Sequence, residues 1–290
     1  MARFSDKAFN LVNGVVMLIV IVVTLYPFYY VLMASLSDSN ALLAHPGLLL
    51  APLNFNFDAY IRVLDNPNIW SGYLNTLIIL IFGTGLNLLL TTLGAYGLSR
   101  KIMLRKPIML GIVFTMYFTG GIIPNYLLIN NWLHLGDSLL ALILPTAINT
   151  WNLIIMRTSF EAVPESLIES GRIDGAGEFG ILFRIVVPLS MPVIAVMILY
   201  YGVGHWNSWF NAMLFIRDRE LFPLQLILRE ILVQNSTDSM QLGSSAADQQ
   251  AIGESIKYAT IMVATLPILA VYPFLQKYFV KGVMIGAIKE

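Results

Sequence analysis

Long apolar segments that lack any charged residue alternate with shorter polar stretches along this chain. Six segments of at least 19 residues contain no Asp, Glu, Lys or Arg, namely 8–37, 66–99, 107–136, 138–156, 185–216 and 258–276. A helix needs about 20 predominantly apolar residues to cross a bilayer. The pattern therefore predicts an all-α polytopic membrane protein with six transmembrane helices. Trimmed at their polar ends, these helices cover about 12–36, 72–98, 108–130, 138–157, 189–213 and 258–277.

The composition supports this class and excludes others. The chain has 290 residues, of which 57% are hydrophobic, and a mean hydropathy of +0.74. These values are typical of a polytopic membrane protein. The net charge is zero, so nothing points to a nucleic-acid partner, and the absence of cysteine excludes disulfides and thiolate chemistry. We expect one transmembrane domain over 1–290, without an internal repeat.

The distribution of basic residues predicts an orientation. An even number of spans places both termini on one side of the membrane. If that side is the cytoplasm, the inner segments hold twelve of the 17 basic residues. Inner loops are enriched in Lys and Arg, so we expect cytoplasmic termini, a cytoplasmic loop at 161–188, an extracytoplasmic loop at 214–257 and a cytoplasmic tail at 278–290.

The predicted spans lack the residues that ion-driven carriers require, and the chain lacks several motifs of enzymes and ATP-binding proteins. Their cores hold no acidic or basic side chain, which argues against a proton-driven or sodium-driven carrier. The sequence contains no H-E-x-x-H, no G-x-S-x-G and no G-x-x-x-x-G-K-[ST]. We therefore expect no catalytic residue, no metal site and no ATP bound by a P-loop, and any energy source must belong to another polypeptide.

Polar and aromatic residues in three of the spans are candidates for a substrate path. Aromatic rings can stack on sugar rings and amides can bind hydroxyl groups. Interfacial belts and interhelical hydrogen bonds account for the same residues. The candidates are Tyr117, Asn149, Asn152, Tyr201, His205, Trp206, Trp209 and Asn211.

The 161–188 loop is the only long stretch rich in charge between the apolar segments. Pro164 can occupy the first position of a helix, and acidic side chains at Glu165 and Glu169 favour its first turns. Glu169 and Arg172 have the spacing of residues on one helix face.

Two glycines divide this loop. Gly175 and Gly177 are expected to break or bend the chain, and a second short helix over about 178–187 is expected to end at Pro188. The residues predict a helix–turn–helix on the membrane surface, with acidic groups facing the cytoplasm and apolar groups facing the bundle. An ordinary amphipathic loop is the alternative.

The same loop resembles the EAA loop of ABC importer permeases. That pattern reads E-A-A, three residues, G, nine residues and I-x-L-P, and this chain has ESG at 169–171, Gly175 and IVVP at 185–188 with the same spacings. Ser170 and Gly171 replace two alanines, and Val187 replaces a leucine. Residues 75–100 and the tail 278–288 further resemble sugar permeases related to the smaller membrane subunit of the maltose transporter. FPLQLILREIL at 222–232 resembles the branch for complex oligosaccharides and lipoprotein-linked systems.

The resemblance implies the core of a type I ABC importer permease, with a cytoplasmic coupling helix within 164–180. This helix would sit in a cleft of a separate ATPase, and residues 281–290 would reach between the two ATPase subunits. The resemblance assigns coupling to Glu165, Glu169, Arg172, Asp174, Gly175 and Ala176.

The implied partners define a complex in a bacterial cytoplasmic membrane. They are a second, non-identical permease, a cytoplasmic ABC ATPase dimer that binds ATP and Mg, and an extracytoplasmic solute-binding lipoprotein that delivers an oligosaccharide. The chain itself would bind no cofactor and catalyse no reaction. A permease for a non-sugar solute, a membrane enzyme and a structural scaffold are the alternatives.

Overall fold

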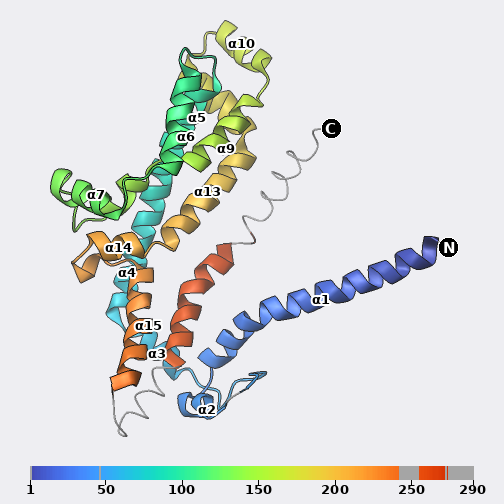
Figure 1. Ribbon diagram of the computed structural model, residues 1–290, viewed down its shortest axis with the longest axis vertical. Helices are drawn as coiled ribbons and strands as arrows, with labels where there is room; N and C mark the ends of the chain where they lie inside the picture. Colours follow the sequence, from blue (N-terminus) through green and yellow to red (C-terminus); the bar gives the residue numbers. More distant parts are fainter. Residues whose placement is uncertain (1, 46, 242–254, 272, 274–290) are drawn as a thin grey trace. The chain divides into compact units, whose positions relative to one another are not determined.

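The computed structural model describes residues 2–45, 47–241, 255–271 and 273, and every regular element among them is a helix (Figure 1). The all-α prediction is confirmed for this part of the chain. The residues group into two compact units, Met1–Ile69 with Leu228–Pro267 and Trp70–Ile227 with Ile268–Glu290. The single transmembrane domain expected over 1–290 stays a prediction.

The first unit is built around α1 (Ala2–Ser35), an unbroken helix over the first predicted span. Most of its apolar side chains from residue 9 to 28 are exposed, as expected for a helix that lies against lipid or another protein. The unit also contains α2 (Ser39–Leu43), α3 (Asp58–Leu64) and most of the helix Ser255–Val271. A hydrogen bond of 2.5 Å between the hydroxyls of Ser39 and Ser255 joins parts of this unit that are far apart in sequence.

The second unit contains most of the remaining helices. Two of them, α4 (Pro67–Ile78) and α15 (Leu224–Gln241), begin or end in the first unit. The others are α5 (Thr84–Ser99), α6 (Arg105–Tyr117), α7 (Ile122–Leu127), α8 (Leu140–Ile143), α9 (Thr150–Glu161), α10 (Glu165–Ile173), α11 (Glu178–Ile181), α12 (Val187–Leu189), α13 (Met191–Trp206) and α14 (Phe210–Phe215). Short π-helical or 3-10 turns cover Ile79–Gly83, Leu128–Trp132, Leu144–Thr146, Leu182–Val186 and Arg219–Leu221.

Two helices of the described chain are long and apolar enough to cross a membrane, Lys7–Ser35 and Pro67–Ser99. Three bent helix pairs also have the required length and composition if each pair is taken as one span. Ser255–Val271 is a shorter apolar helix. The structure thus places helices at all six apolar segments, although only two of them are continuous and of full length.

The prediction of one helix over 108–130 is wrong. The chain forms α6 and then α7, whose axes meet at 106°. The break falls at Phe118–Gly121, where Gly120 and Gly121 weaken the helix and Gly121 has a φ of +85°. Because only glycine adopts this conformation readily, the chain can turn sharply here.

The prediction of a single helix over 138–157 is also wrong, and the prediction of one over 189–213 is wrong at its far end. The segment Leu140–Thr146 meets α9 at 50°, and the segment Glu178–Leu189 meets α13 at 86°. Pro145 lies in the 3-10 turn just before the first of these breaks, and Pro188 and Pro192 flank the second at Ser190, where the fifth span was predicted to begin. Proline lacks the backbone N–H that a continuous helix requires. The predicted fifth span divides at its far end, where α13 stops at Trp206.

The long 214–257 loop carries a helix of its own. Residues 235–241, the start of the polar stretch NSTDSMQLGSSAADQQ, continue α15. No Gly or Pro occurs from Leu224 to Gln241, so α15 contains no helix-breaking residue. Residues 242–254 and the predicted cytoplasmic tail 278–290 lie outside the described residues.

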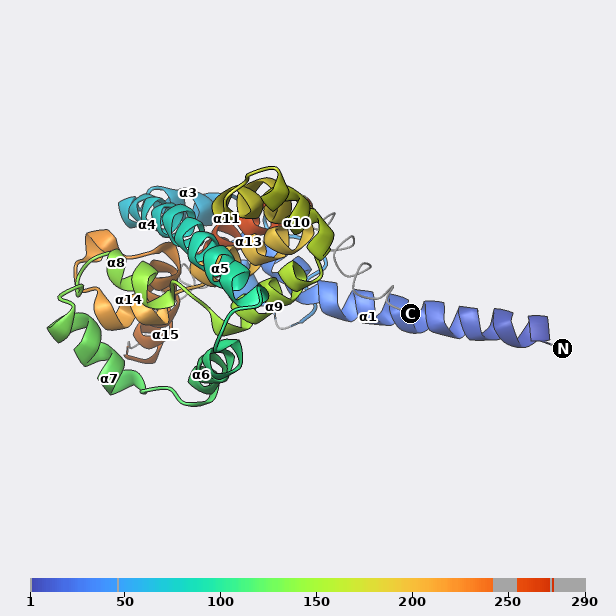
Figure 2. The same ribbon diagram turned by 90° about the horizontal axis from the view of Figure 1, so that it is seen from above.

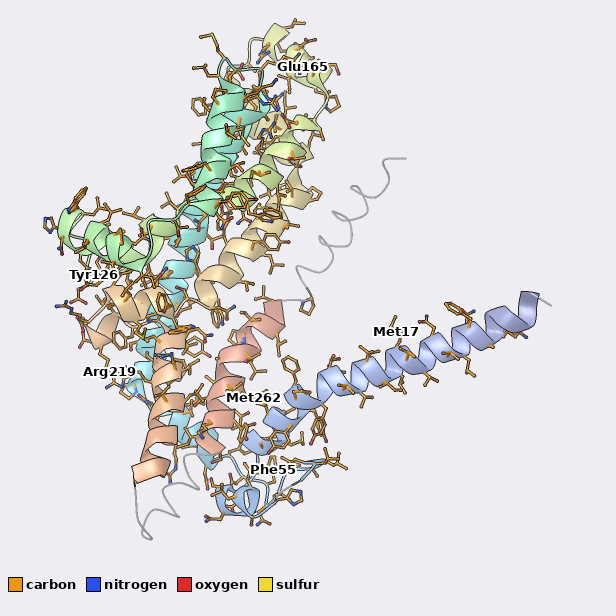
Figure 3. All side chains as sticks on the ribbon, in the orientation of Figure 1. Met17, Phe55, Tyr126, Glu165, Arg219 and Met262 are labelled. Atoms are coloured by element: carbon orange, nitrogen blue, oxygen red, sulfur yellow. The ribbon has the colours of Figure 1, made fainter. Side chains whose placement is uncertain are left out.

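The core of the second unit forms around α5, which packs against α9 and α13. The cluster includes Ala95 and Leu98 of α5, Met156 and Phe160 of α9 and Met197 of α13, each almost fully buried. Figure 2 shows α5 among α9, α11 and α13, with α6 further out beside α9. Figure 3 shows Glu165 near one end of this unit and Tyr126 and Arg219 toward the other.

Gly72 provides a test of how α4 holds the start of α15. A Cβ atom at Gly72 would lie 3.1 Å from the Cα of Leu224, 3.2 Å from its backbone nitrogen and 2.5 Å from Cδ1 of Ile227. Backbone atoms cannot move aside as a side-chain end can. Gly72→Ala should therefore lower the free energy of unfolding by about 1–3 kcal/mol, measured by thermal unfolding in detergent. Gly85→Ala is the control, because a Cβ there meets nothing within 4 Å. Equal stability of the two variants would contradict the close packing of α4 on α15.

Candidate functional site

The 161–188 loop folds as the predicted helix–turn–helix. Pro164 precedes α10 with a ψ of 129° and is therefore its N-cap and not its first residue. Gly175 has a φ of +81°, which lets the chain turn between α10 and α11. The second helix continues through α12 to Leu189, one residue beyond the proline that was expected to end it.

Close packing explains why Gly171 departs from the family alanine. Ile168 is fully buried and Gly171 is buried beside it. A Cβ at Gly171 would lie 2.8 Å from Cδ1 of Ile185 and 3.3 Å from Cγ1 of Ile181. The missing methyl group thus allows α10 to approach the second helix of the loop. Ile185 is the isoleucine of the EAA-like pattern, so two of its positions meet in space.

A carboxylate that sequence reasoning missed fixes the loop to the bundle. Glu178 Oε2 accepts a hydrogen bond of 2.5 Å from the hydroxyl of Tyr96 on α5. Glu178 Oε1 accepts two from the guanidinium of Arg172, at 2.9 and 3.1 Å. Glu169 and Arg172 both lie in α10 with the expected one-face spacing, but the ion-pair partner of Arg172 is Glu178. The hydrogen bond from Tyr96, together with that from Arg172, lowers the pKa of Glu178, so the carboxylate is charged at neutral pH.

The outward surface of the loop is partly acidic and partly apolar. Glu169, Asp174 and Gly175 are exposed as predicted. The expectation that the apolar groups face the bundle is wrong for Ile173 and Phe179, whose exposed fractions are 86% and 71%. Large apolar side chains exposed next to polar ones are typical of a protein-binding surface. The remaining predicted coupling residues lie in the same region: Glu165, which is 3.9 Å from Lys101, and Ala176, which is half-buried.

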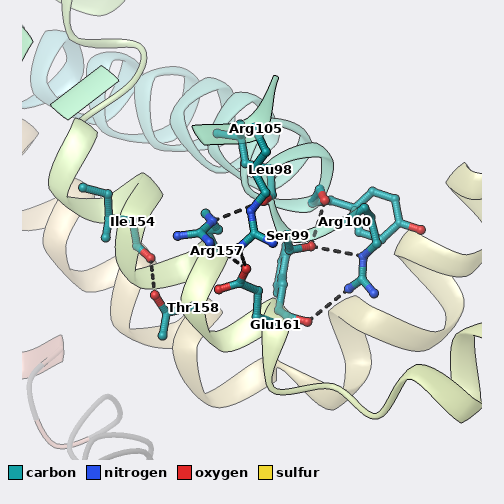
Figure 4. Close-up of polar contacts among 10 residues, drawn as sticks. Leu98, Ser99, Arg100, Arg105, Ile154, Arg157, Thr158 and Glu161 are labelled. Carbon is teal, nitrogen blue, oxygen red and sulfur yellow. Dashed lines mark hydrogen bonds and ion pairs between the residues drawn. The ribbon is translucent and has the colours of Figure 1, made fainter. Parts of the chain in front are cut away.

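Ionic contacts brace the end of α9, from which the loop begins (Figure 4). Arg157 donates to Glu161 Oε1 at 2.6 Å and to the carbonyl of Leu98 at 3.1 Å. Arg105 forms an ion pair with the same Glu161 carboxylate, and Arg100 donates to the carbonyl of Phe160 at 3.1 Å. In the sequence these arginines indicated only the orientation of the chain in the membrane. In the structure they also attach α5 and α6 to the start of the loop.

A central pocket of about 330 Å³ lies where α9, α13 and α14 meet. Six of the eight predicted path residues line it, and no Asp, Glu, Lys or Arg is among its lining residues. The six are Asn149, Asn152, Tyr201, His205, Trp209 and Asn211. The structure does not bring the other two there. Tyr117 is 78% exposed on α6, and the buried Trp206 packs with its ring 6.2 Å from that of Tyr73.

A buried hydrogen-bond network forms one wall of the pocket, and its α5 residues were missed. His205 Nε2 donates to Asn87 Oδ1 at 2.6 Å. The Asn87 amide donates to the carbonyls of Thr146 and Ala147 at 2.6 and 2.9 Å. The i,i+4 pair of polar residues at 87 and 91 within an apolar helix was the available signal.

The second α5 residue of the network holds Tyr201. The hydroxyls of Thr91 and Tyr201 lie 2.7 Å apart, and the Tyr201 oxygen accepts a hydrogen bond of 3.2 Å from the backbone N–H of Asn149. Tyr201 and His205 thus have structural roles whatever they do for a substrate.

A second polar site joins Asp137, between the third and fourth apolar segments, to the start of the predicted extracytoplasmic loop 214–257. The Asp137 carboxylate accepts hydrogen bonds from the backbone N–H groups of Asp218 at 2.8 Å and Arg217 at 2.9 Å. These backbone bonds lower the pKa of Asp137. The site is adjacent to a cavity of about 390 Å³ lined by residues that include Asn130 and His134. The described residues contain no group of three or more His, Cys, Asp or Glu that could hold a metal ion.

The fold and these sites define a helical membrane protein with a polar pocket and an exposed loop. No protein-family model matches the sequence. The polygalacturonan/rhamnogalacturonan transport system permease protein YtcP of Bacillus subtilis (strain 168) is 40% identical over 289 residues, covering 98% of this chain and 99% of that protein. Protein LplC of the same organism is 41% identical over 268 residues, covering 92% and 90%.

A solved structure agrees with these relatives. A chain in the crystal structure of a bacterial ABC transporter involved in the import of the acidic polysaccharide alginate is 33% identical and has a TM-score of 0.85. The match covers 95% of this chain and 98% of that one. The chain therefore belongs to the carbohydrate ABC transporter permease family.

The buried network predicts a strong effect of removing the Asn87 amide. Asn87→Ala would leave two carbonyls without a donor and the His205 ring without an acceptor, at about 1–3 kcal/mol for a buried unsatisfied group. We expect a clearly lower unfolding temperature in detergent. Asn211→Ala, an amide loss on the half-buried pocket wall, should change it little. Unchanged stability of Asn87→Ala would show that these carbonyls are satisfied in another way.

Proposed function

We propose that this permease forms half of the translocation path of an ATP-driven oligosaccharide importer and couples to a separate ATPase through residues 164–180. The observation that carries this proposal is the arrangement of α10. Its buried face, Ile168 and Gly171, is packed on the bundle, while Glu169 and Ile173 on the loop remain exposed. A rigidly supported surface of this kind can accept force from a docked protein and pass it to the helices.

The proposed topology has six spans with both termini in the cytoplasm of a bacterium. The spans are the helices Lys7–Ser35 and Pro67–Ser99, the two bent pairs that begin at Arg105 and Leu140, α13 with α14, and the helix that begins at Ser255. Broken helices are compatible with a membrane where their free backbone groups are paired inside the protein. The positive-inside distribution of the 17 basic residues supports this orientation, which places the 161–188 loop next to a cytoplasmic ATPase.

The proposed complex contains the partners that the family pattern implies. A second, non-identical permease completes the path, an ABC ATPase dimer binds ATP and Mg, and an extracytoplasmic lipoprotein delivers the sugar. This chain would be no enzyme by itself and would bind no cofactor. Outer segments such as the loops joined by Asp137 are available for the binding protein.

The substrate side of the proposal rests on the central pocket. Its lining combines amides with aromatic side chains and contains no formally charged carboxylate, ammonium or guanidinium group. Amides can bind sugar hydroxyls, and rings such as Trp209 offer apolar faces. Relatives whose names specify polygalacturonan, rhamnogalacturonan or alginate support an oligosaccharide as the solute.

Charge reversal at Glu169 tests the coupling assignment. Glu169→Lys should reduce sugar uptake at least tenfold, because it replaces a favourable pairing at the ATPase surface with a repulsion. Uptake into cells and co-purification of the ATPase are the measurements. Lys106→Glu, a charge reversal on the exposed start of α6 outside residues 164–180, is the control. Normal uptake by Glu169→Lys would rule out coupling through this side chain.

Asn211 offers a cleaner test of the pocket than Tyr201 or His205, which hold the fold together. Asn211→Ala should raise the substrate concentration for half-maximal uptake about 2- to 10-fold, the equivalent of one hydrogen bond of about 0.5–1.5 kcal/mol. Complex assembly should be unchanged. Tyr117→Phe is the control, because Tyr117 does not line the pocket. If both variants transport like the wild type, Asn211 does not contact the sugar.

A further inference from the structure

We infer that the hydrogen bond between Tyr96 and Glu178 transmits movement of the 161–188 loop to α5, and that Tyr96 is a positioning residue for transport. This inference rests on the proposed function, since it concerns how ATPase-driven movement of the loop reaches the spans. It assigns a role to two residues that lie outside the E-A-A, G and I-x-L-P positions of the family pattern.

The bond has the geometry of a strong, directional contact. The Tyr96 hydroxyl donates to Glu178 Oε2 over 2.5 Å, within the range for O–H donors to ionised carboxylates. Tyr96 is only 7% exposed, so its ring cannot swing away without disturbing the core. The guanidinium carbon of Arg100 lies 5.0 Å from the ring centroid, which further restricts the ring.

Glu178 joins three helices through a single carboxylate. It is the first residue of α11, directly after the turn that contains Gly175. One of its oxygens binds Tyr96 of α5 and the other binds Arg172 of α10. Movement of α10 must therefore either carry the carboxylate with it, and so pull on α5, or break these bonds.

The apolar contacts of the loop cannot by themselves fix the position of α10 and α11 relative to α5. Ile168 packs in the same cluster as Ile181 and Leu182, but apolar contacts are non-directional. Such contacts depend weakly on orientation, whereas a hydrogen bond weakens steeply when its angle changes. Tyr96 and Glu178 thus supply a directional contact between α5 and α11, in addition to the contacts that Arg100 and Arg157 make at the end of α9.

The other end of α5 carries the pocket network. Asn87 and Thr91 of the same helix bind His205 and Tyr201. Nine residues separate Asn87 from Tyr96, about 13 Å along a helix. Thr84–Ser99 is regular α-helix without proline, so a displacement at Tyr96 reaches the pocket wall as a rigid-body movement.

Tyr96→Phe removes only the hydroxyl and tests the inference. The full complex of both permeases, ATPase and binding protein is reconstituted in liposomes, and the number of ATP molecules hydrolysed per sugar imported is measured. We expect this ratio to rise at least threefold, with ATPase binding intact, because the ATPase would cycle without moving α5 effectively. Tyr117→Phe, the same chemical change on an exposed tyrosine, should leave the ratio unchanged.

Variants of the carboxylate test the same bond from its other side. Glu178→Gln keeps an oxygen that accepts from Tyr96 and should leave the ratio within twofold of the wild type, whereas Glu178→Ala should raise it as Tyr96→Phe does. The double variant Tyr96→Phe/Glu178→Ala should be no worse than either single change. Glu178 is largely exposed, so its variants remain informative if Tyr96→Phe does not assemble.

The outcomes separate this inference from the proposed function. An unchanged ratio in Tyr96→Phe and Glu178→Ala, or uptake and hydrolysis that fall in proportion, would overturn the role of the bond. Additive effects in the double variant would do the same. A wild-type complex that hydrolyses ATP without any sugar uptake would instead overturn the proposed function.

Discussion

The bent helices of this permease depend on donors and acceptors that satisfy the backbone groups freed at each break. In hydrocarbon no water is available for this purpose. The continuous helical run Pro67–Ser99 supplies many of them. Asn87 donates to the carbonyls of Thr146 and Ala147 between α8 and α9. Asn75 donates to two carbonyls before α15, and Thr76 accepts from the first N–H of that helix. The polar residues of this span therefore permit the irregular backbone around it.

This requirement changes the meaning of polar residues around the pocket. Polar side chains in an apolar span suggest a substrate path, and most of the predicted ones do line one pocket. Yet Tyr201 accepts from the backbone of Asn149, and His205 binds Asn87. Their hydrogen-bonding capacity is largely used within the protein. The remaining lining, including Trp209 and Asn211 on the far side of the break after α13, is better placed to contact a solute.

The sequence predicted where helices form more reliably than how they bend. Apolar length alone located all six helical segments, because burial in lipid depends on composition. The bend after α6 requires Gly121 in a left-handed conformation, and a glycine in an apolar run does not reveal that choice. The sequence predicted the turn at Gly175 and placed Glu169 and Arg172 on one helix face, but it indicated no partner for Arg172. Its real partner, Glu178, lies beyond the turn, where helical periodicity no longer applies.

Gly171 shows how a departure from a family pattern can be part of the packing. Alanine is the better helix former by about 1 kcal/mol, so glycine weakens α10 in isolation. In the folded loop it lies against Ile181 and Ile185, and the shorter distance between the helices also brings Arg172 within reach of Glu178. The loss in helix propensity is thus offset by contacts that only a close approach allows. Because the nearest obstructing atom is the mobile end of Ile185, the family alanine and this glycine differ in how closely α10 approaches and not in the design of the loop.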